Sequence, residues 1–292
     1  MPSPSIVDET PSYAVLFKPP RVHTVPLKGE ASRAGHEPSL LDWCGKRLPQ
    51  VLAVQGKHPW EGGIVHRLDY ETQGLVLVAK TQAALDSFWA QQEKGFIIKD
   101  YGALAAKRED LLPGFPPVFS GGVDACRIAS GFRPYGPGRK AVRPVLFPLG
   151  DGSDFSMKPG KWKKKSALDQ GRPYVTEILE PYGQLPRHRV LPKQVSVEPV
   201  YFRLRIKRGF RHQIRCHLAW IGYPILNDTL YGGLPRDVVS LRSHCSERVC
   251  VEGLEFPVLG LIAQGMRFYD PVSAEPRHYT QERIAIPWKS SR

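Results

Sequence analysis

The stretch GGIVHRLDYETQGLVLVAK, residues 62–80, joins a crowded polar segment to a short apolar run. Basic and acidic side chains lie close together over residues 66–72. The run from Leu75 to Ala79 is short and rich in aliphatic and β-branched residues, which predicts a buried strand. The polar residues therefore lie on a loop that leads directly into the core, where a rigid strand can hold reactive side chains in place.

Outside this stretch, apolar and alternating segments predict further strands. They cover residues 13–17, 97–105, 174–179, 201–206 and 258–263. Residues 283–287 form another short apolar segment, and residues 1–12 are polar and rich in proline, which predicts a loose tail.

Helix signals are local and clear at three places. Ser39 is a good N-cap for a helix that reaches Leu48 before Pro49, and Thr81 is a good N-cap for a helix that ends before Gly95. A third helix is predicted from residue 211 to about residue 222, with one apolar stripe.

Residues 107–172 are the hardest part of the chain to interpret. They contain many prolines and glycines and two basic clusters, Arg139-Lys140 and Lys158 to Lys165, the second with Trp162 inside it. Long loops in a compact domain are usually functional or disordered. A basic loop with an aromatic residue can hold an RNA backbone, while a solvated charge run is the plainer interpretation.

The charge balance narrows the range of partners. Lys and Arg total 41 against 28 Asp and Glu, a formal net charge of +13. Such a balance suits a polyanion, with nucleic acid first and an anionic membrane surface second, although a merely soluble basic protein is also possible. A hydrophobic content of 41% is enough for a sizeable core.

The cysteines do not suggest a disulfide framework. There are five, and no pair has CxxC spacing, which favours a reducing compartment and a cytoplasmic location. His244, Cys245 and Cys250 lack a matching second half, so we predict no metal site there. We find no signal-peptide pattern and no apolar run of the roughly 20 residues that cross a bilayer, so no membrane partner is expected.

Residues 66–80 carry a family resemblance. His66-Arg67-Leu68-Asp69, Thr72, then Gly74-Leu75 and an apolar run ending in Ala79-Lys80 resemble the signature of the RluA-type pseudouridine synthases. The resemblance implies that Asp69 is the catalytic residue. Gln73 departs from the serine that is usual in the family, at a position away from the acid.

A second motif, residues 209–218, supports the same resemblance. Its His-Gln-Ile-Arg places Arg215 on the family pattern, and residues 224–232 continue that pattern with Pro-Ile and Asp-x-x-Tyr-Gly. The family usually has Gly-Arg-Thr before this motif, so Arg211 is displaced by one residue. Lys99 and Tyr101 match a Lys-x-Tyr of the family. Lys18-Pro19 after the first strand, and Ala263, Met266 and Phe268 in the last, also match.

The resemblance implies an architecture and a set of roles. It implies an α+β fold with a mixed, mostly antiparallel sheet flanked by helices, in one bilobed catalytic domain over residues 13–288. It implies catalysis by Asp69, Tyr101 and Arg215, RNA contacts by His66, Arg67, Arg211 and Lys99, no cofactor, and a monomer that acts on ribosomal or transfer RNA. For His66, a packed structural imidazole is the plainer interpretation.

The chemistry predicts a further relationship within the site. Isomerisation of uridine needs an ionised carboxylate in a pocket that holds little water. Burial raises the pKa of an aspartate and a nearby cation lowers it by roughly 1–3 units, so we hypothesise that Arg215 lies beside Asp69. Whether Asp69 bonds C1′ or takes the C2′ proton stays open.

Two other function classes stay open at this point. A glycoside-cleaving enzyme would use Asp69 and Glu71 as a pair, but such pairs face the bond from opposite sides. Two carboxylates so close in sequence more naturally share one side. The other class is an RNA-binding protein without catalysis, against which the presence of Asp69, Tyr101 and Arg215 argues.

Overall fold

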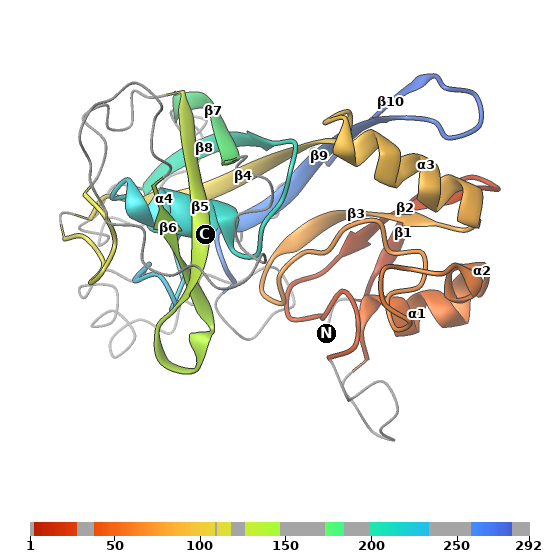
Figure 1. Ribbon diagram of the computed structural model, residues 1–292, viewed down its shortest axis with the longest axis horizontal. Helices are drawn as coiled ribbons and strands as arrows, with labels where there is room; N and C mark the ends of the chain where they lie inside the picture. The colour runs from red at the N-terminus through yellow and green to blue at the C-terminus, as the bar shows by residue number, and fades with distance from the viewer. Residues whose placement is uncertain are drawn as a thin grey trace, which may run out of the picture.

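The computed structural model describes residues 3–27, 38–108, 110–117, 126–146, 173–183, 199–233 and 258–281. Four helices and ten strands lie in these ranges (Figure 1). The helices are α1 (Leu40–Arg47), α2 (Gln50–Ala53), α3 (Gln82–Glu93) and α4 (Gln213–Trp220), with a short 3-10 turn at Pro137–Arg139. The strands are β1 (Ser5–Glu9), β2 (Tyr13–Lys18), β3 (Gln73–Ala79), β4 (Ile98–Ala106), β5 (Arg127–Tyr135), β6 (Ala141–Val145), β7 (Tyr174–Gly183), β8 (Pro199–Ile206), β9 (Leu261–Tyr269) and β10 (Pro276–Thr280).

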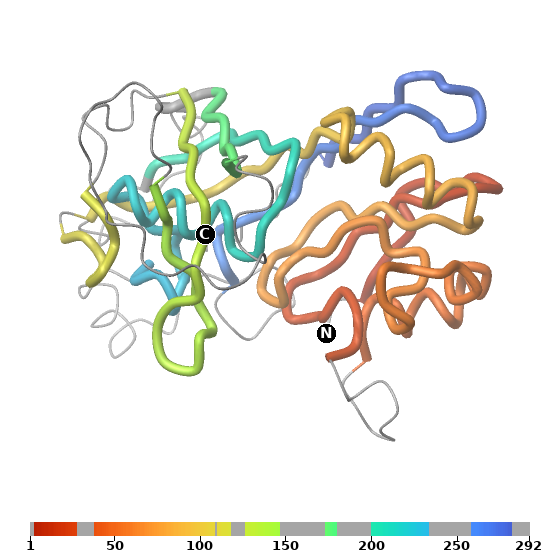
Figure 2. The backbone as a smooth tube through the Cα atoms, in the orientation of Figure 1, coloured from red at the N-terminus to blue at the C-terminus, as the bar shows by residue number. Residues whose placement is uncertain are grey.

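These strands form one mixed sheet. Its order is β1-β2-β3-β9-β4-β8-β7-β5-β6, with β10 added to β9. The described pairings are antiparallel except that of β3 with β9. The predicted α+β class with a mostly antiparallel sheet is confirmed. Two halves lie side by side in Figure 2, with β1 to β3 and the helices α1 to α3 in one and β5 to β8 with α4 in the other.

Alternation along the strands separates two cores. In β2 and β3, Leu16 and Val76 belong to one apolar cluster, while Val15 and Leu77 belong to the other. Because successive side chains of a strand point to opposite faces, the two clusters lie on opposite sides of the sheet. α3 covers the second cluster, whereas α1 and α4 cover the first. Leu68, beside Asp69, and Ile214, at the start of α4, therefore lie on the same side of the sheet.

The predicted helix boundaries are close to the observed ones. Ser39 accepts a hydrogen bond from the Asp42 amide, and the Asp42 carboxylate accepts one from the Ser39 amide, so a capping box starts α1. Thr81 caps α3, and Gly95 after it has φ of +74°, a conformation that suits glycine.

Three predictions need correction or extension. Residues 1–12 are not all a loose tail, because Ser5–Glu9 pairs with β2 as an edge strand. The segment 107–172 contains β5 and β6, which close the far edge of the sheet. α4 is buried along its whole length rather than along one stripe, since β6 and β7 also pack against it. The Lys158 to Lys165 cluster with Trp162, the His244-Cys245-Cys250 group and residues 283–287 lie outside the described residues.

Candidate active site

The loop that carries Asp69 is held from both sides. Val65 donates its amide to the Leu77 carbonyl, which fixes the incoming chain against β3. Thr24 Oγ1 donates to the Leu68 carbonyl at 2.8 Å and accepts from the Leu68 amide at 3.1 Å. A turn then closes where the Thr72 amide donates to the Asp69 carbonyl at 3.1 Å. The backbone at Asp69 is therefore fixed by contacts on either side of it.

Lys18, at the end of β2, is a buried amine beneath this loop. Its Nζ donates to the carbonyls of Pro19 at 2.9 Å, Val22 at 2.7 Å and Tyr70 at 3.4 Å. Burial lowers the pKa of Lys18 to about 7, while the charges of Asp69 and Glu71 act to raise it. Lys18 thus ties the segment after β2 to the Asp69 loop.

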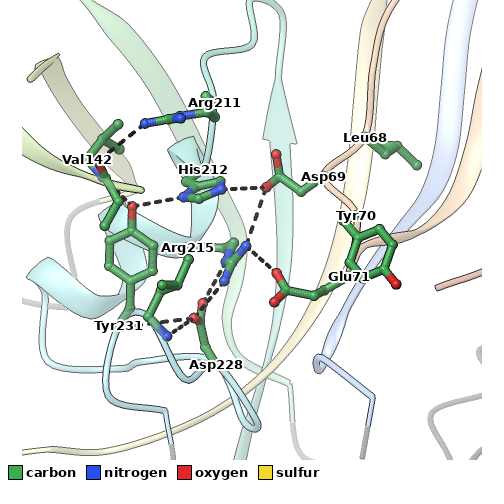
Figure 3. Close-up of polar contacts among 12 residues, drawn as sticks. Leu68, Asp69, Tyr70, Glu71, Val142, Arg211, His212, Arg215, Asp228 and Tyr231 are labelled. Atoms are coloured by element: carbon green, nitrogen blue, oxygen red, sulfur yellow. Dashed lines mark hydrogen bonds and ion pairs between the residues drawn. The ribbon is translucent and has the colours of Figure 1, made fainter. Parts of the chain in front are cut away.

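Arg215 on α4 is the best-connected cation of the site (Figure 3). Its Nε and Nη2 each donate to Asp228 at 2.8 Å, a two-pronged pair in which both side chains are buried. Nη1 donates to Glu71 Oε2 at 2.8 Å and lies 3.8 Å from Asp69 Oδ2. The guanidinium is therefore fixed by Asp228 and turned toward the Asp69 loop.

Asp69 keeps partial access to solvent, with its side chain 24% exposed. Burial raises the pKa of Asp69, and Arg215, Lys18 and Arg211 oppose that shift through their charges. The hypothesis that Arg215 acts to lower this pKa has the right sign, but burial is the larger effect, so the pKa of Asp69 is raised. The opposing charges favour the ionised form of a carboxyl that burial disfavours.

His212 lies on the other side of Asp69, with Nε2 4.0 Å from Asp69 Oδ2. Burial, followed by the charges of Arg215 and Arg211, lowers the pKa of His212 to about 3. The imidazole is therefore neutral near pH 7 and adds no positive charge. Its Nδ1 is 3.3 Å from the Tyr231 hydroxyl, which accepts a hydrogen bond from the Val142 amide (Figure 3). This chain of contacts links β6 to the site.

Tyr101 and Lys99 lie two residues apart on β4, on the face that α4 covers. Tyr101 is only 6% exposed. Burial raises the pKa of Tyr101, and the charge of Asp69 raises it further. Burial lowers the pKa of Lys99 to about 8. Of the three residues predicted to act in catalysis, Asp69 and Arg215 lie 3.8 Å apart, and Tyr101 is buried on the face of the sheet that α4 covers.

The other predicted contacts lie around this group. His66 is buried, accepts from the Leu77 amide at its Nε2, and has a pKa lowered by burial and by Lys99, which favours a packed structural imidazole. Arg67 points to solvent and donates to Glu61. Arg211 donates to the carbonyls of Arg139 and Ala141, although its charge still acts on Asp69.

The sequence analysis assigned no function to three residues of the site, Asp228, Lys18 and His212. Asp228 and His212 stand inside quoted motifs, and Lys18 opens the predicted connection after β2. The Asp-x-x-Tyr spacing was an available signal, because Asp228 Oδ1 accepts the Leu230 and Tyr231 amides and so forms a turn. Only the fold reveals that this same carboxylate holds Arg215.

In the part of the chain that the structure describes, no three His, Cys, Asp or Glu side chains gather as metal ligands. None of the helices in those same ranges has the length and apolar character needed to cross a membrane.

Sequence comparisons identify relatives over most of the chain. The profile of a family described as RNA pseudouridylate synthase matches residues 12–220. A protein of Aquifex aeolicus described as an uncharacterized RNA pseudouridine synthase is 25% identical over 287 residues, 93% of this chain and 66% of that protein. Ribosomal large subunit pseudouridine synthase D of Pasteurella multocida is 28% identical over 273 residues, 93% of this chain and 64% of the relative. The enzyme of the same name from Haemophilus ducreyi is 30% identical over 234 residues, 80% and 54% of the two chains.

Solved structures show the same fold. Human RNA Pseudouridylate Synthase Domain Containing 4 superposes with a TM-score of 0.55 at 16% identity, covering 97% of this chain and 90% of its own. Human RNA Pseudouridylate Synthase Domain Containing 1 gives 0.52 at 19% identity, covering 95% and 82%. The chain spans between 54% and 66% of the length of the three sequence relatives above.

Proposed function

This chain belongs to the RNA pseudouridylate synthase family, and from that premise we propose that it isomerises a uridine of structured RNA to pseudouridine. The predicted resemblance to that family is confirmed. In the proposed reaction the N1–C1′ bond breaks, the uracil turns, and a C5–C1′ bond forms. C5 loses a proton and N1, once released from the sugar, gains one, so the overall composition is unchanged and nothing is oxidised or reduced.

The observation that carries the proposal is the position of Asp69 opposite Arg215. The carboxylate has 24% of its side chain exposed and lies 3.8 Å from a guanidinium that Asp228 holds in place. An anion that is accessible, next to a fixed cation and free of a short hydrogen bond to it, suits attack at the sugar. Asp69 would act at the ribose, by bonding C1′ or by taking the C2′ proton, and the structure supports both routes equally.

Tyr101 and Arg67 complete the proposed site. Tyr101, buried near Asp69, would stack on the uracil and help the C5 proton leave. The target base must leave its stack to reach the pocket, and a planar guanidinium such as Arg67 can stack in the gap. Arg67 has 59% of its side chain exposed, so it is available at the surface.

The sequence also predicted RNA contacts for Arg211, Lys99 and His66, and burial distinguishes the three. Arg211 is exposed and adds positive charge near Asp69, which suits a phosphate contact. Lys99 is buried on β4 and His66 accepts a backbone amide, so we propose that both support the pocket walls rather than meet the RNA backbone.

The RNA target is proposed from charge and from the names of relatives. The net charge of +13 supplies phosphate contacts that do not depend on sequence. Two of the relatives above are named for the large ribosomal subunit, so we propose ribosomal RNA as the first target to test and transfer RNA as the second. One catalytic domain over residues 13–288, a monomeric state and a cytoplasmic location stay predictions from the sequence.

The arrangement of carboxylates disfavours the glycoside-hydrolase alternative. Asp69 and Glu71 both face the same nitrogen of Arg215, at 3.8 and 2.8 Å. A hydrolytic pair must approach the bond from opposite sides, which two carboxylates on one nitrogen do not do.

The test uses RNA labelled with tritium at uridine C5, isolated from cells that lack the gene. We expect the wild-type protein to release tritium and to form pseudouridine, and Asp69→Asn to do neither while still binding RNA. Full release by Asp69→Asn would refute the assignment of Asp69. Free uracil as the product would indicate hydrolysis, and RNA binding without release by the wild type would indicate a non-catalytic protein.

A further inference from the structure

Two aromatic rings stack on the surface of the loop that precedes the Asp69 segment. The rings of His58 and Trp60 lie 4.8 Å apart between centroids, with 6° between their planes. His58 is exposed and Trp60 is half-buried. Parallel rings at this distance form a flat stack, and the outer face of such a stack can receive a further ring.

The loop that presents the rings is held in shape. The Glu61 amide donates to the His58 carbonyl at 3.0 Å, which closes a tight turn around both rings. The Gly63 amide donates to the Val51 carbonyl at 2.8 Å and ties the end of the turn to α2. At Gly56, a side chain would come within 2.7 Å of the Gly62 carbonyl, so the two ends of the loop touch.

Packing does not account for the two rings. Trp60 is absent from both core clusters and from the side chains that pack on them in the described part of the chain, whereas Trp43 and Trp89 do pack on those clusters. A tryptophan that is half-buried on a fixed turn, with an exposed histidine stacked on it, leaves apolar surface in water. Because His58 is exposed, the face of its ring that is turned away from Trp60 can receive a single planar ligand group.

The rings are connected to the proposed site through the residue that follows Trp60. Glu61 Oε1 accepts from Arg67 Nη1 at 3.1 Å, and Arg67 stands two positions before Asp69. Lys57 precedes His58 and places a further positive charge at the loop, near the Trp89 ring. The rings therefore lie on the same stretch of surface as Arg67.

We propose that the stacked rings of His58 and Trp60 form a platform on which a base of the bound RNA, flanking the target uridine, stacks. The proposal rests on the proposed function, and it extends it by naming a second contact for the same RNA. Base stacking on aromatic side chains tolerates any base, and Lys57 and Arg67 supply charge for the adjoining phosphates. RNA is favoured over an apolar peptide because the exposed cations Lys57 and Arg67 adjoin the loop that carries the rings.

The test measures binding of two short fluorescein-labelled oligomers by anisotropy. One is an oligouridylate, and the other is an abasic oligomer of equal length that keeps the ribose phosphates. We expect Trp60→Ala to lose about tenfold in affinity for the oligouridylate and to bind the abasic oligomer as the wild type does. Trp60→Phe, which keeps a ring, should retain most of the affinity. Unchanged binding of the abasic oligomer also shows that the variant is folded.

The matched control is Phe96→Ala. Phe96 and Tyr269 are another exposed aromatic pair, with ring centroids 5.7 Å apart, between α3 and β4 and at the end of β9. We expect Phe96→Ala to bind both oligomers like the wild type. Equal loss for Trp60→Ala and Phe96→Ala, or no loss for Trp60→Ala, overturns the platform.

Tritium release by the wild-type protein separates the two proposals. If the wild type releases tritium from the labelled RNA while Trp60→Ala keeps full affinity for the oligouridylate, the platform fails and the proposed function stands. If the wild type releases none, the proposed function fails, whatever the oligomers show.

Discussion

Arg215 and Asp69 face each other at 3.8 Å, without the 2.8 Å hydrogen bonds that Arg215 makes to Asp228 and Glu71. The positive charge of Arg215 therefore acts on Asp69, while its N–H groups donate to Asp228 and Glu71. A carboxylate engaged by two short bonds would have its lone pairs occupied. Asp69 instead keeps an oxygen available for a substrate.

Removing the anchor of Arg215 should damage both stability and activity. Asp228→Asn leaves a buried guanidinium with one charged partner fewer, which we expect to lower the free energy of unfolding by about 3 kcal/mol. Arg215 should also lose its fixed orientation, so tritium release should fall at least tenfold in protein that is still folded. Denaturant unfolding and the release assay measure the two effects.

Asp100→Asn is the matched control for that change. Asp100 accepts from Arg205 at 2.7 Å and from Arg267 at 2.9 Å, and it follows Lys99 on β4, so it points to the face of the sheet opposite the site. We expect lower stability with tritium release close to that of the wild type. Wild-type release by folded Asp228→Asn would show that Arg215 needs no anchor.

The acid limb of the pH profile should report Asp69. Burial raises the pKa of Asp69, so the ionised fraction falls at a higher pH than for an ordinary aspartate, which titrates near roughly 4. We expect the single-turnover rate of tritium release to decline on acidification before that pH is reached, and the decline to persist in Glu71→Gln. A limb at or below the ordinary aspartate range would contradict the burial that we describe.

The hydroxyl of Tyr101 can be tested apart from its ring. Tyr101→Phe keeps the aromatic surface but removes the group that we propose to help the C5 proton leave. General acid–base groups contribute about a hundredfold or more, so we expect tritium release to slow by at least that factor while RNA binding is retained. Release at the wild-type rate would limit Tyr101 to stacking.

A buried histidine in α4 should make the fold sensitive to acid. His217 has Nε2 2.9 Å from Ser130 Oγ and Nδ1 2.8 Å from Thr176 Oγ1, and burial lowers its pKa to about 3. Between its ordinary pKa of about 6.5 and that value, the unfolded chain binds a proton that the folded chain excludes. Stability is therefore lost as pH falls through this range, by up to about 1.4 kcal/mol per pH unit for this group.

His217→Gln gives the corresponding comparison. Glutamine keeps polar atoms for the two hydroxyls but does not titrate. The variant should therefore show a shallower fall of unfolding free energy between roughly pH 6.5 and pH 5 than the wild type, whatever its stability at neutral pH. Parallel slopes for the two proteins would mean that His217 is protonated in the folded state.

Local signals in the sequence predicted much of this fold. Ser39 and Thr81 start their helices as expected, because a cap is defined by residues three or four positions apart. The run from Leu75 to Ala79 is a fully buried strand, as its aliphatic and β-branched residues predicted. β1 was missed because its residues are mostly exposed and gain their order from pairing with β2. An edge strand of this kind has little apolar pattern of its own.

The site was predictable only in part, because its contacts join distant segments. Asp69 and Arg215 were placed together by the family pattern and by charge. The partnership of Arg215 with Asp228 depends on the turn after α4, and that of Lys18 with the Tyr70 carbonyl depends on the pairing of β2 with β3. No spacing in the sequence encodes those contacts. Arg67 shows the opposite case, since it is an exposed side chain paired with Glu61, only six positions away in the sequence.

The most direct measurement compares Asp69→Asn with Glu71→Gln in single-turnover tritium release, with RNA in which uridine carries tritium at C5. Both carboxylates face Nη1 of Arg215, so either substitution removes one negative charge from the same guanidinium. We predict that Asp69→Asn releases no tritium and that Glu71→Gln keeps at least a tenth of the wild-type rate. Sustained release by Asp69→Asn, with loss of release in Glu71→Gln, would contradict the account and assign the chemistry to Glu71.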